Sequence, residues 1–150
     1  MASVVARRRC PVVVMHNRLD RNYRKFWSDL LLDLKASLAL GSAAGIEKAQ
    51  LWTDPGFGFA KTIPQNLEVL RDLNRISALG FPVLVGTSRK STIGAVLGAT
   101  VDDRLEGSGA TIVWAIAQGC QMIRVHDVRE MTRFARMADA IKAGLGYVSG

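Results

Sequence analysis

Thr53-Asp54-Pro55-Gly56-Phe57-Gly58-Phe59-Ala60-Lys61 joins a short apolar run to a loop that contains one proline and two glycines. Proline has no N–H for a sheet ladder, and the glycines allow backbone angles that other residues avoid, so we expect a strand to end at Asp54. The two phenylalanines are unusual in a loop. They indicate a strand end that carries an acidic ligand-binding residue, or an ordinary connection whose aromatic rings pack into the core.

A helix is expected directly after this loop. Thr62 can cap its first turn, Gln65 stands three residues further on as in a capping box, and Pro64 suits the first turn. The loop is therefore predicted to be fixed at both ends.

Short apolar runs and longer helix-type segments alternate along the whole chain. The expected strands are residues 11–15, 51–54, 82–86 and 122–126. The expected helical segments are residues 23–45, 64–79, 91–118 and 131–143, with glycine caps at Gly80, Gly98, Gly119 and Gly144. Strands separated by helices pair in parallel, which predicts an α/β fold. Alternation along the strands predicts one sheet face that carries Val14, Trp52, Leu84 and Met122.

Composition indicates one globular domain with a substantial core, since 49% of the 150 residues are hydrophobic. The net charge of +7 is spread along the chain, so we expect small anionic ligands and no nucleic-acid partner. Cys10 and Cys120 fit no metal or redox spacing and are predicted to be buried free thiols in a reducing compartment. The apolar run at residues 12–15 is too short for a signal peptide or a membrane span, so we expect a cytoplasmic protein without a membrane partner.

Polar or charged residues end all four expected strands, and the carboxyl ends of parallel strands are where ligands bind. After the third strand, residues 86–92 place hydroxyl groups and the cations of Arg89 and Lys90 on a turn before a helix. The start of a helix favours anions, so this turn indicates an anion site. A solvated Arg-Lys pair at a helix start is the alternative.

In the fourth strand, Arg124 and His126 share one face, whereas Ile123 and Val125 share the other. An inward arginine needs an anionic partner, because an unpaired buried charge is costly. The partner is either a nearby carboxylate, Asp127 or Glu130, or a phosphate or pyrophosphate ligand.

Taken together, these motifs resemble the C-terminal half of the dihydropteroate synthase family of the folate pathway. The matching blocks are residues 12–16, 54–62, 82–91 and 123–129, in the family's order. The resemblance covers nearly the whole chain. It implies strands and helices 5–8 of a (β/α)8 TIM barrel, with residues 1–150 forming a pterin-binding domain that is incomplete at its N-terminus.

The activity implied by the resemblance is a transferase reaction. It condenses 6-hydroxymethyl-7,8-dihydropterin pyrophosphate with p-aminobenzoate to give dihydropteroate and pyrophosphate. For the pterin, the resemblance implies that Asp54 accepts two ring donors and that Lys90, Phe59 and Met15 complete the pocket.

For p-aminobenzoate, the resemblance implies contacts from Ser88, Arg89 and Lys90. Arg124 and His126 would hold the pyrophosphate and stabilise it as it leaves, so Lys90, Arg124 and His126 are the expected catalytic residues.

The family's first four strands have no counterpart in this sequence. They carry the residue that links Mg²⁺ to the pyrophosphate, so the resemblance implies a Mg²⁺ cofactor but no metal ligand in this chain. Because four parallel strands cannot close a barrel, we expect doubtful activity from this chain alone, and completion by a homodimer or by a complementing N-terminal half.

Two other functions remain open at this stage. A pterin-binding methyltransferase would keep Asp54 but has no evident use for the cations after the third and fourth strands. A non-catalytic half-barrel would bind no pterin pyrophosphate.

Overall fold

Four short strands, each an apolar run that ends near a polar residue, form the centre of the fold. The computed structural model describes residues 1–146. The strands are β1 (Val12–Met15), β2 (Leu51–Asp54), β3 (Leu84–Val85) and β4 (Met122–Ile123). The helices are α1 (Ala2–Arg8), α2 (Phe26–Ala43), α3 (Ile63–Arg71), α4 (Asn74–Ser77), α5 (Ser91–Leu97), α6 (Leu105–Ala117) and α7 (Val128–Ala143). Short 3₁₀ turns lie at η1 (Lys48–Gln50), η2 (Val101–Asp103) and η3 (Gly144–Gly146).

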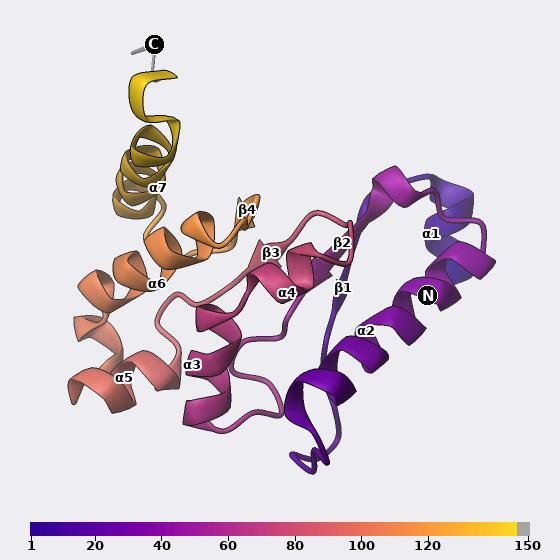
Figure 1. Cartoon of the computed structure of the whole chain (residues 1–150), viewed down its shortest axis with the longest axis horizontal. Coiled ribbons are helices and arrows are strands. Elements are labelled where there is room, and N and C mark those ends of the chain that lie inside the picture. The colour runs from indigo at the N-terminus through magenta and orange to yellow at the C-terminus, as the bar shows by residue number, and fades with distance from the viewer. Residues whose placement is uncertain (147–150) are drawn as a thin grey trace.

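All strand pairs in the described residues are parallel. β1 pairs with β2 from Val12↔Leu51 to Met15↔Asp54, and β3 pairs with β4 at Leu84↔Met122 and Val85↔Ile123. A parallel bridge between Thr53 and Val83 joins the two pairs. The strands therefore follow one another in chain order, and Figure 1 shows the elements fanning out in the same order, from α1 and α2 to α7. The predicted α/β class and parallel pairing are confirmed.

Local sequence explains where the elements end. Thr62 and Gln65 form the predicted capping box at the start of α3. The four expected glycine caps all have positive φ, between 53° and 96°. The segment expected as one helix at 64–79 is divided, because α3 ends at Asp72, whose φ of −113° and ψ of 30° interrupt the helix. Gly98 similarly ends α5 and divides the segment expected at 91–118.

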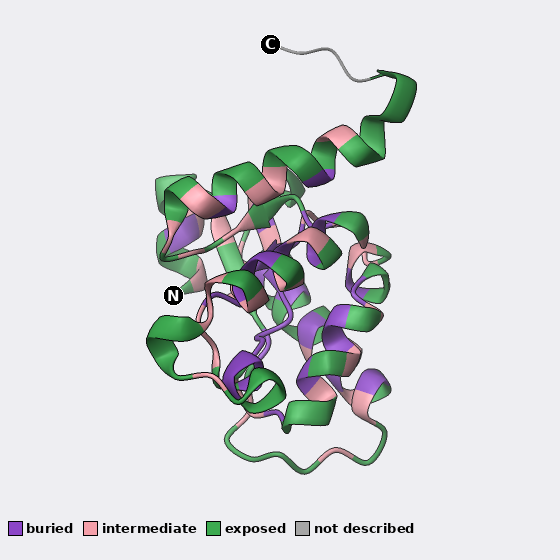
Figure 2. Ribbon diagram, turned by 90° about the vertical axis from the view of Figure 1, so that its left-hand side faces the viewer, coloured by how far each residue is buried: buried purple, intermediate pink, exposed green. Residues whose placement is uncertain are grey.

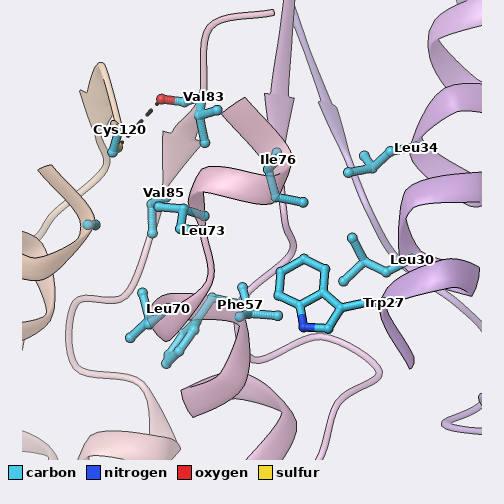
Figure 3. Close-up of a cluster of buried hydrophobic side chains, with 12 residues drawn as sticks. Trp27, Leu30, Leu34, Phe57, Leu70, Leu73, Ile76, Val83, Val85 and Cys120 are labelled. Carbon is cyan, nitrogen blue, oxygen red and sulfur yellow. Dashed lines mark hydrogen bonds between the residues drawn. The ribbon is translucent and has the colours of Figure 1, made fainter. Parts of the chain in front are cut away.

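The main core lies between the sheet and the helices on one side of it. Leu30 and Leu34 of α2 meet Leu73, Ile76 and strand residues such as Val83 and Val85, with the Trp27 indole at one end (Figure 3). A second cluster joins α1 to α2 and β2 through Val5, Leu38 and Leu51. A third joins α6 to α7 through Ile112, Ile116 and Met131. Figure 2 shows that α7 itself is mostly exposed.

The opposite face of the sheet carries apolar side chains that these helices do not cover. Val13 is 41% exposed and Met122 42% exposed, and Met15 and the half-buried Trp52 lie on the same face. Trp52, Leu84 and Met122 are on the predicted face. The prediction for Val14 was wrong, because Val14 packs against the helix-side clusters and the register pairs Val13 with Trp52. We call Val13, Met15, Trp52 and Met122, together with Leu84, which lies on the same side but is only 8% exposed, the open face.

Both cysteines are free thiols, but only one is buried. Cys120 lies in the main core, and burial raises the pKa of its thiol to about 11. Cys10 is exposed beside α1, so the prediction of two buried thiols was wrong for this residue. Within residues 1–146, no helix is both long and apolar enough to cross a membrane.

The two faces of the sheet should differ in their contribution to stability. Leu30 is fully buried, so Leu30→Ala should lower the free energy of unfolding by about 2–5 kcal/mol. Met122→Ala on the open face should lower it by about 1 kcal/mol or less, because much of that side chain is already in water. Urea unfolding of the two variants measures the difference. Equal losses would contradict the assignment of the faces.

Candidate functional site

The end of β2 places a carboxylate under a tight loop. Asp54 is 8% exposed, and its Oδ1 accepts a hydrogen bond from the Gly56 N–H at 2.7 Å. Gly56 has a φ of 67°, and a Cβ at this position would lie 1.9 Å from the carbonyl oxygen of His16. Only glycine therefore allows the loop to close over the end of β1, as the sequence indicated.

Asp54 keeps one oxygen available. Within residues 1–146 no group donates a hydrogen bond to Oδ2. This oxygen is not fully enclosed by the protein. Burial raises the pKa of Asp54, while the Gly56 N–H and the charges of Arg124, Lys61 and Lys90 act in the opposite direction. The arrangement presents an acceptor to a ligand in a partly desolvated place.

The two phenylalanines of the loop have different surroundings. One packs into the core, and the other lies beside the predicted site. Phe57 is 2% exposed and packs in the main core. Phe59 is half-buried, and the Lys90 Nζ lies 4.3 Å from the centre of its ring. Burial and the nearby Arg124 lower the pKa of Lys90. Phe59 therefore links the loop after β2 to the turn after β3.

The turn after β3 is fixed by its neighbours. Ser88 is buried, and its Oγ accepts the His126 N–H at 3.3 Å and lies 3.0 Å from His126 Nδ1. Arg89 pairs through Nε and Nη2 with the Asp127 carboxylate, which lowers the pKa of Asp127. The Arg-Lys pair is thus not simply solvated, because Arg89 bridges to the end of β4.

Ser108 and Arg104, which the sequence did not single out, support this turn. The Arg89 N–H donates to Ser108 Oγ, and the Arg89 carbonyl accepts from Arg104 Nη1. Arg89 itself has a left-handed φ of 57°. Arg104 also donates to the Ala99 carbonyl. A Cβ at Gly94 would lie 2.2 Å from this guanidinium. An isolated arginine followed four residues later by serine carries no sequence signal for such a role.

A depression of about 560 Å³ lies at the ends of β3 and β4. Its lining includes Ser88, Arg89, Lys90, Arg124 and His126. Within residues 1–146, neither Lys90 nor Arg124 has a carboxylate within 4.0 Å. The structural alternative for Arg124, an ion pair with Asp127 or Glu130, is therefore contradicted, since Asp127 pairs with Arg89. These cations suit an anion that carries several charges.

The predicted site residues thus lie along one edge of the sheet. Met15 is the register partner of Asp54, Lys90 bridges Phe59 and the depression, and Arg124 lies against Gly86, where a Cβ would be 3.5 Å from its Nε. The edge combines a carboxylate at one end with cations at the other that have no carboxylate partner within residues 1–146.

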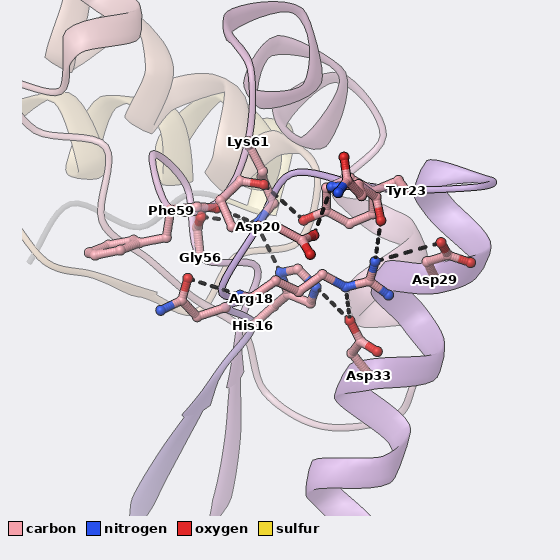
Figure 4. Close-up of polar contacts among 12 residues, drawn as sticks. His16, Arg18, Asp20, Tyr23, Asp29, Asp33, Gly56, Phe59 and Lys61 are labelled. Atoms are coloured by element: carbon pink, nitrogen blue, oxygen red, sulfur yellow. Dashed lines mark hydrogen bonds and ion pairs between the residues drawn. The ribbon is translucent and has the colours of Figure 1, made fainter.

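A second polar cluster at the ends of β1 and β2 was not predicted. His16 and Lys61 are both buried and lie 3.0 Å apart, and Asp33 of α2 joins His16 to Arg18 (Figure 4). In the sequence, His16 directly follows an expected strand but carries no sign of its partners, and Asp33 lies inside a helix, where nothing in the sequence marks it.

In the described part of the chain, no three side chains of histidine, cysteine, aspartate or glutamate come close enough to hold a metal ion.

Comparison with known proteins gives a consistent result. The pterin binding enzyme family profile matches residues 1–126. The chain is 47% identical over 141 residues to a dihydropteroate synthase of Bacillus subtilis and 45% identical over 142 residues to one of Clostridium beijerinckii. Each alignment covers 94% of this chain, but the chain spans only about half the length of these curated relatives, 50% and 53%.

Solved structures agree in fold. The chain superposes with a TM-score of 0.92 on a dihydropteroate synthase of Clostridium difficile crystallised in the presence of pteroic acid, at 45% identity. That match covers 94% of this chain and 54% of the other. A dihydropteroate synthase of Xanthomonas albilineans in complex with 7,8-dihydropteroate gives 0.90 at 36% identity, covering 95% of this chain and 54% of that one. The predicted half of a TIM barrel is thereby confirmed.

The buried His16 should make stability depend on pH. Burial and the Lys61 ammonium lower the pKa of His16 from 6.5 to about 4. Between these values the unfolded chain binds a proton at His16 that the folded chain does not, so the contribution of this residue to the free energy of unfolding should fall by roughly 3 kcal/mol as the pH drops through this window. The pKa values of Asp33 and Asp127 are lowered from 3.8, so these two residues affect the free energy of unfolding only at pH values below this window.

Urea unfolding at several pH values between 4 and 6.5 measures this slope. His16→Gln should flatten it, because glutamine does not titrate. The same slope in the variant and the unmodified chain would contradict the assignment.

Proposed function

Since this chain belongs to the pterin-binding enzyme family, we propose that it supplies the Asp54 and Arg124 side of a dihydropteroate synthase active site. The reaction joins 6-hydroxymethyl-7,8-dihydropterin pyrophosphate to p-aminobenzoate. One observation carries the proposal: a carboxylate with an open oxygen and two cations without carboxylate partners in residues 1–146 lie along the same sheet edge. A pterin methyltransferase would use the carboxylate but would have no evident role for the two cations.

The carboxylate end suits the pterin. A pterin ring presents an N–H and an amino group side by side, and a carboxylate can accept from both. Asp54 would make these bonds, with the Phe59 ring as an apolar wall. Lys90 would donate to the ring oxygen and nitrogen, and Met15 would pack beside the ring.

The cationic end suits the leaving group. The p-aminobenzoate nitrogen attacks the CH₂ carbon of the pterin, the bond from that carbon to the pyrophosphate oxygen breaks, and the electron pair leaves with the pyrophosphate. The nitrogen then loses a proton to solvent. Arg124 and His126 would stabilise the charge that grows on the departing oxygen, so catalysis is mainly positioning and electrostatic stabilisation.

The turn after β3 would hold p-aminobenzoate. Ser88 and Arg89 are already oriented by His126 and Asp127, and Lys90 lies between them and the pterin position. A preorganised turn of this kind spends no binding energy on ordering these side chains.

The Mg²⁺ ion and the cover of the open face would both come from outside the described residues. Mg²⁺ would be held by the pyrophosphate and by groups other than the described residues, and when bound it would neutralise part of the phosphate charge. The open face would be covered by a complementing half or a second copy, because covering Val13, Trp52 and Met122 removes apolar surface from water. The free thiols fit a cytoplasmic location.

Asp54→Asn should weaken binding of 6-hydroxymethylpterin by more than tenfold. Removing one partner of a buried charge-assisted hydrogen bond costs about 2–5 kcal/mol. Calorimetric titration measures the affinity, and Asp139→Asn, on the exposed surface of α7, is the matched control. Unchanged affinity in Asp54→Asn would refute the role of this residue.

Arg124→Ala should discriminate between the two ends of the ligand. Binding of the pterin pyrophosphate should fall far more than binding of the pterin alcohol, because the side chain meets the leaving group. Arg136→Ala on α7 removes an equal charge from an exposed position and serves as the control. Equal losses for both ligands would show that Arg124 does not contact the pyrophosphate.

A further inference from the structure

Lys61 is a buried ammonium group that holds a loop together. It is 4% exposed, and its Nζ contacts three acceptors: His16 Nδ1 at 3.0 Å, the Gly56 carbonyl at 3.1 Å and the Phe59 carbonyl at 3.1 Å. Within residues 1–146 no carboxylate lies within 4.0 Å of it. Burial lowers the pKa of Lys61 to about 8, so the group is still mainly charged at neutral pH. Burying a charge is costly, and here three acceptors compensate it.

The position of Lys61 fixes the state of His16. Nδ1 faces an ammonium group and must accept its hydrogen bond, so the ring proton resides on Nε2. Nε2 lies 3.1 Å from Asp33 Oδ2 and donates to it, and the same oxygen accepts from Arg18 Nε at 2.6 Å. The Tyr23 ring stacks on the imidazole at 6.1 Å. A second proton on His16 would place two cations in contact.

These contacts end at the groups proposed to bind the pterin. Gly56, whose carbonyl Lys61 holds, donates its own N–H to Asp54 Oδ1. Phe59, whose carbonyl Lys61 also holds, carries the ring that contacts Lys90. Figure 4 shows Lys61 and His16 facing one another beyond the strand ends, with Asp33 on the far side of the imidazole. A single ammonium group therefore ties both sides of the loop to the end of β1.

We propose that Lys61 and neutral His16 are positioning residues that set the loop at residues 55–60, and with it Asp54 and Phe59, before the pterin arrives. The proposal rests on the proposed function for the identity of the ligand, but not for the geometry. A methionine would fill the same space without a desolvation cost, yet it would leave the Gly56 and Phe59 carbonyls without their donor.

The chain has two histidines, so long-range ¹H–¹⁵N spectra contain only two imidazole patterns to assign. His16 should show the Nε2–H form and stay neutral down to about pH 4. Lys61→Met should shift the amide signals of Gly56 and Phe59. Lys142→Met is the matched control, because Lys142 also donates to a backbone carbonyl, that of Ile116 at 3.0 Å, but far along the chain from this loop.

Binding separates positioning from general stability. Lys61→Met should weaken binding of 6-hydroxymethylpterin roughly tenfold or more, since a charge-assisted hydrogen-bond network is lost, and should leave inorganic pyrophosphate binding within about twofold. The control should change neither. A His16 that carries its proton on Nδ1 or titrates like a free imidazole would overturn the proposal, as would unchanged loop signals or equal losses for both ligands. If the unmodified chain binds no pterin, the proposed function fails, while the His16 form and the loop signals still decide the positioning role.

Discussion

The burial of two opposite charges beside the end of β2 is the constraint on which the site depends. Asp54 and Lys61 are both almost fully buried, and their charges are compensated mainly by polar groups of the same loop. Such compensation requires the loop to take one conformation, because each displaced carbonyl or N–H would leave a buried group unpaired. This explains the close approach of Gly56 to the end of β1, where no side chain fits.

The parallel sheet then brings chemically different ends together. Its register places Met15 beside Asp54, the bridge from Thr53 to Val83 sets β3 next to β2, and the Arg124 N–H continues the ladder to Val85. The carboxylate that we propose to bind the pterin ring and the cations that we propose to bind its pyrophosphate consequently lie along one edge. The helices contribute support, as Ser108 and Arg104 do for the turn that bears Arg89.

Sequence reasoning predicted what depends on local chemistry. The end of β2, the capping box at Thr62 and the glycine caps follow from neighbouring residues, and the shared face of Arg124 and His126 follows from alternation. It missed what depends on distant segments: the phase of β1, which places Val13 and not Val14 on the open face, and the choice of Arg89 as the partner of Asp127. It also missed the contacts of Asp33 and Arg104, because neither residue stands in a pattern that identifies its partner.

In the proposed site, one ligand spans the edge from Asp54 to Arg124. Calorimetric titration of the chain with 6-hydroxymethyl-7,8-dihydropterin pyrophosphate, repeated with saturating pterin alcohol and with saturating inorganic pyrophosphate, tests it most directly. Each fragment should bind more weakly than the whole ligand, and each should compete with it. Binding of the whole ligand that inorganic pyrophosphate does not weaken would contradict the proposal.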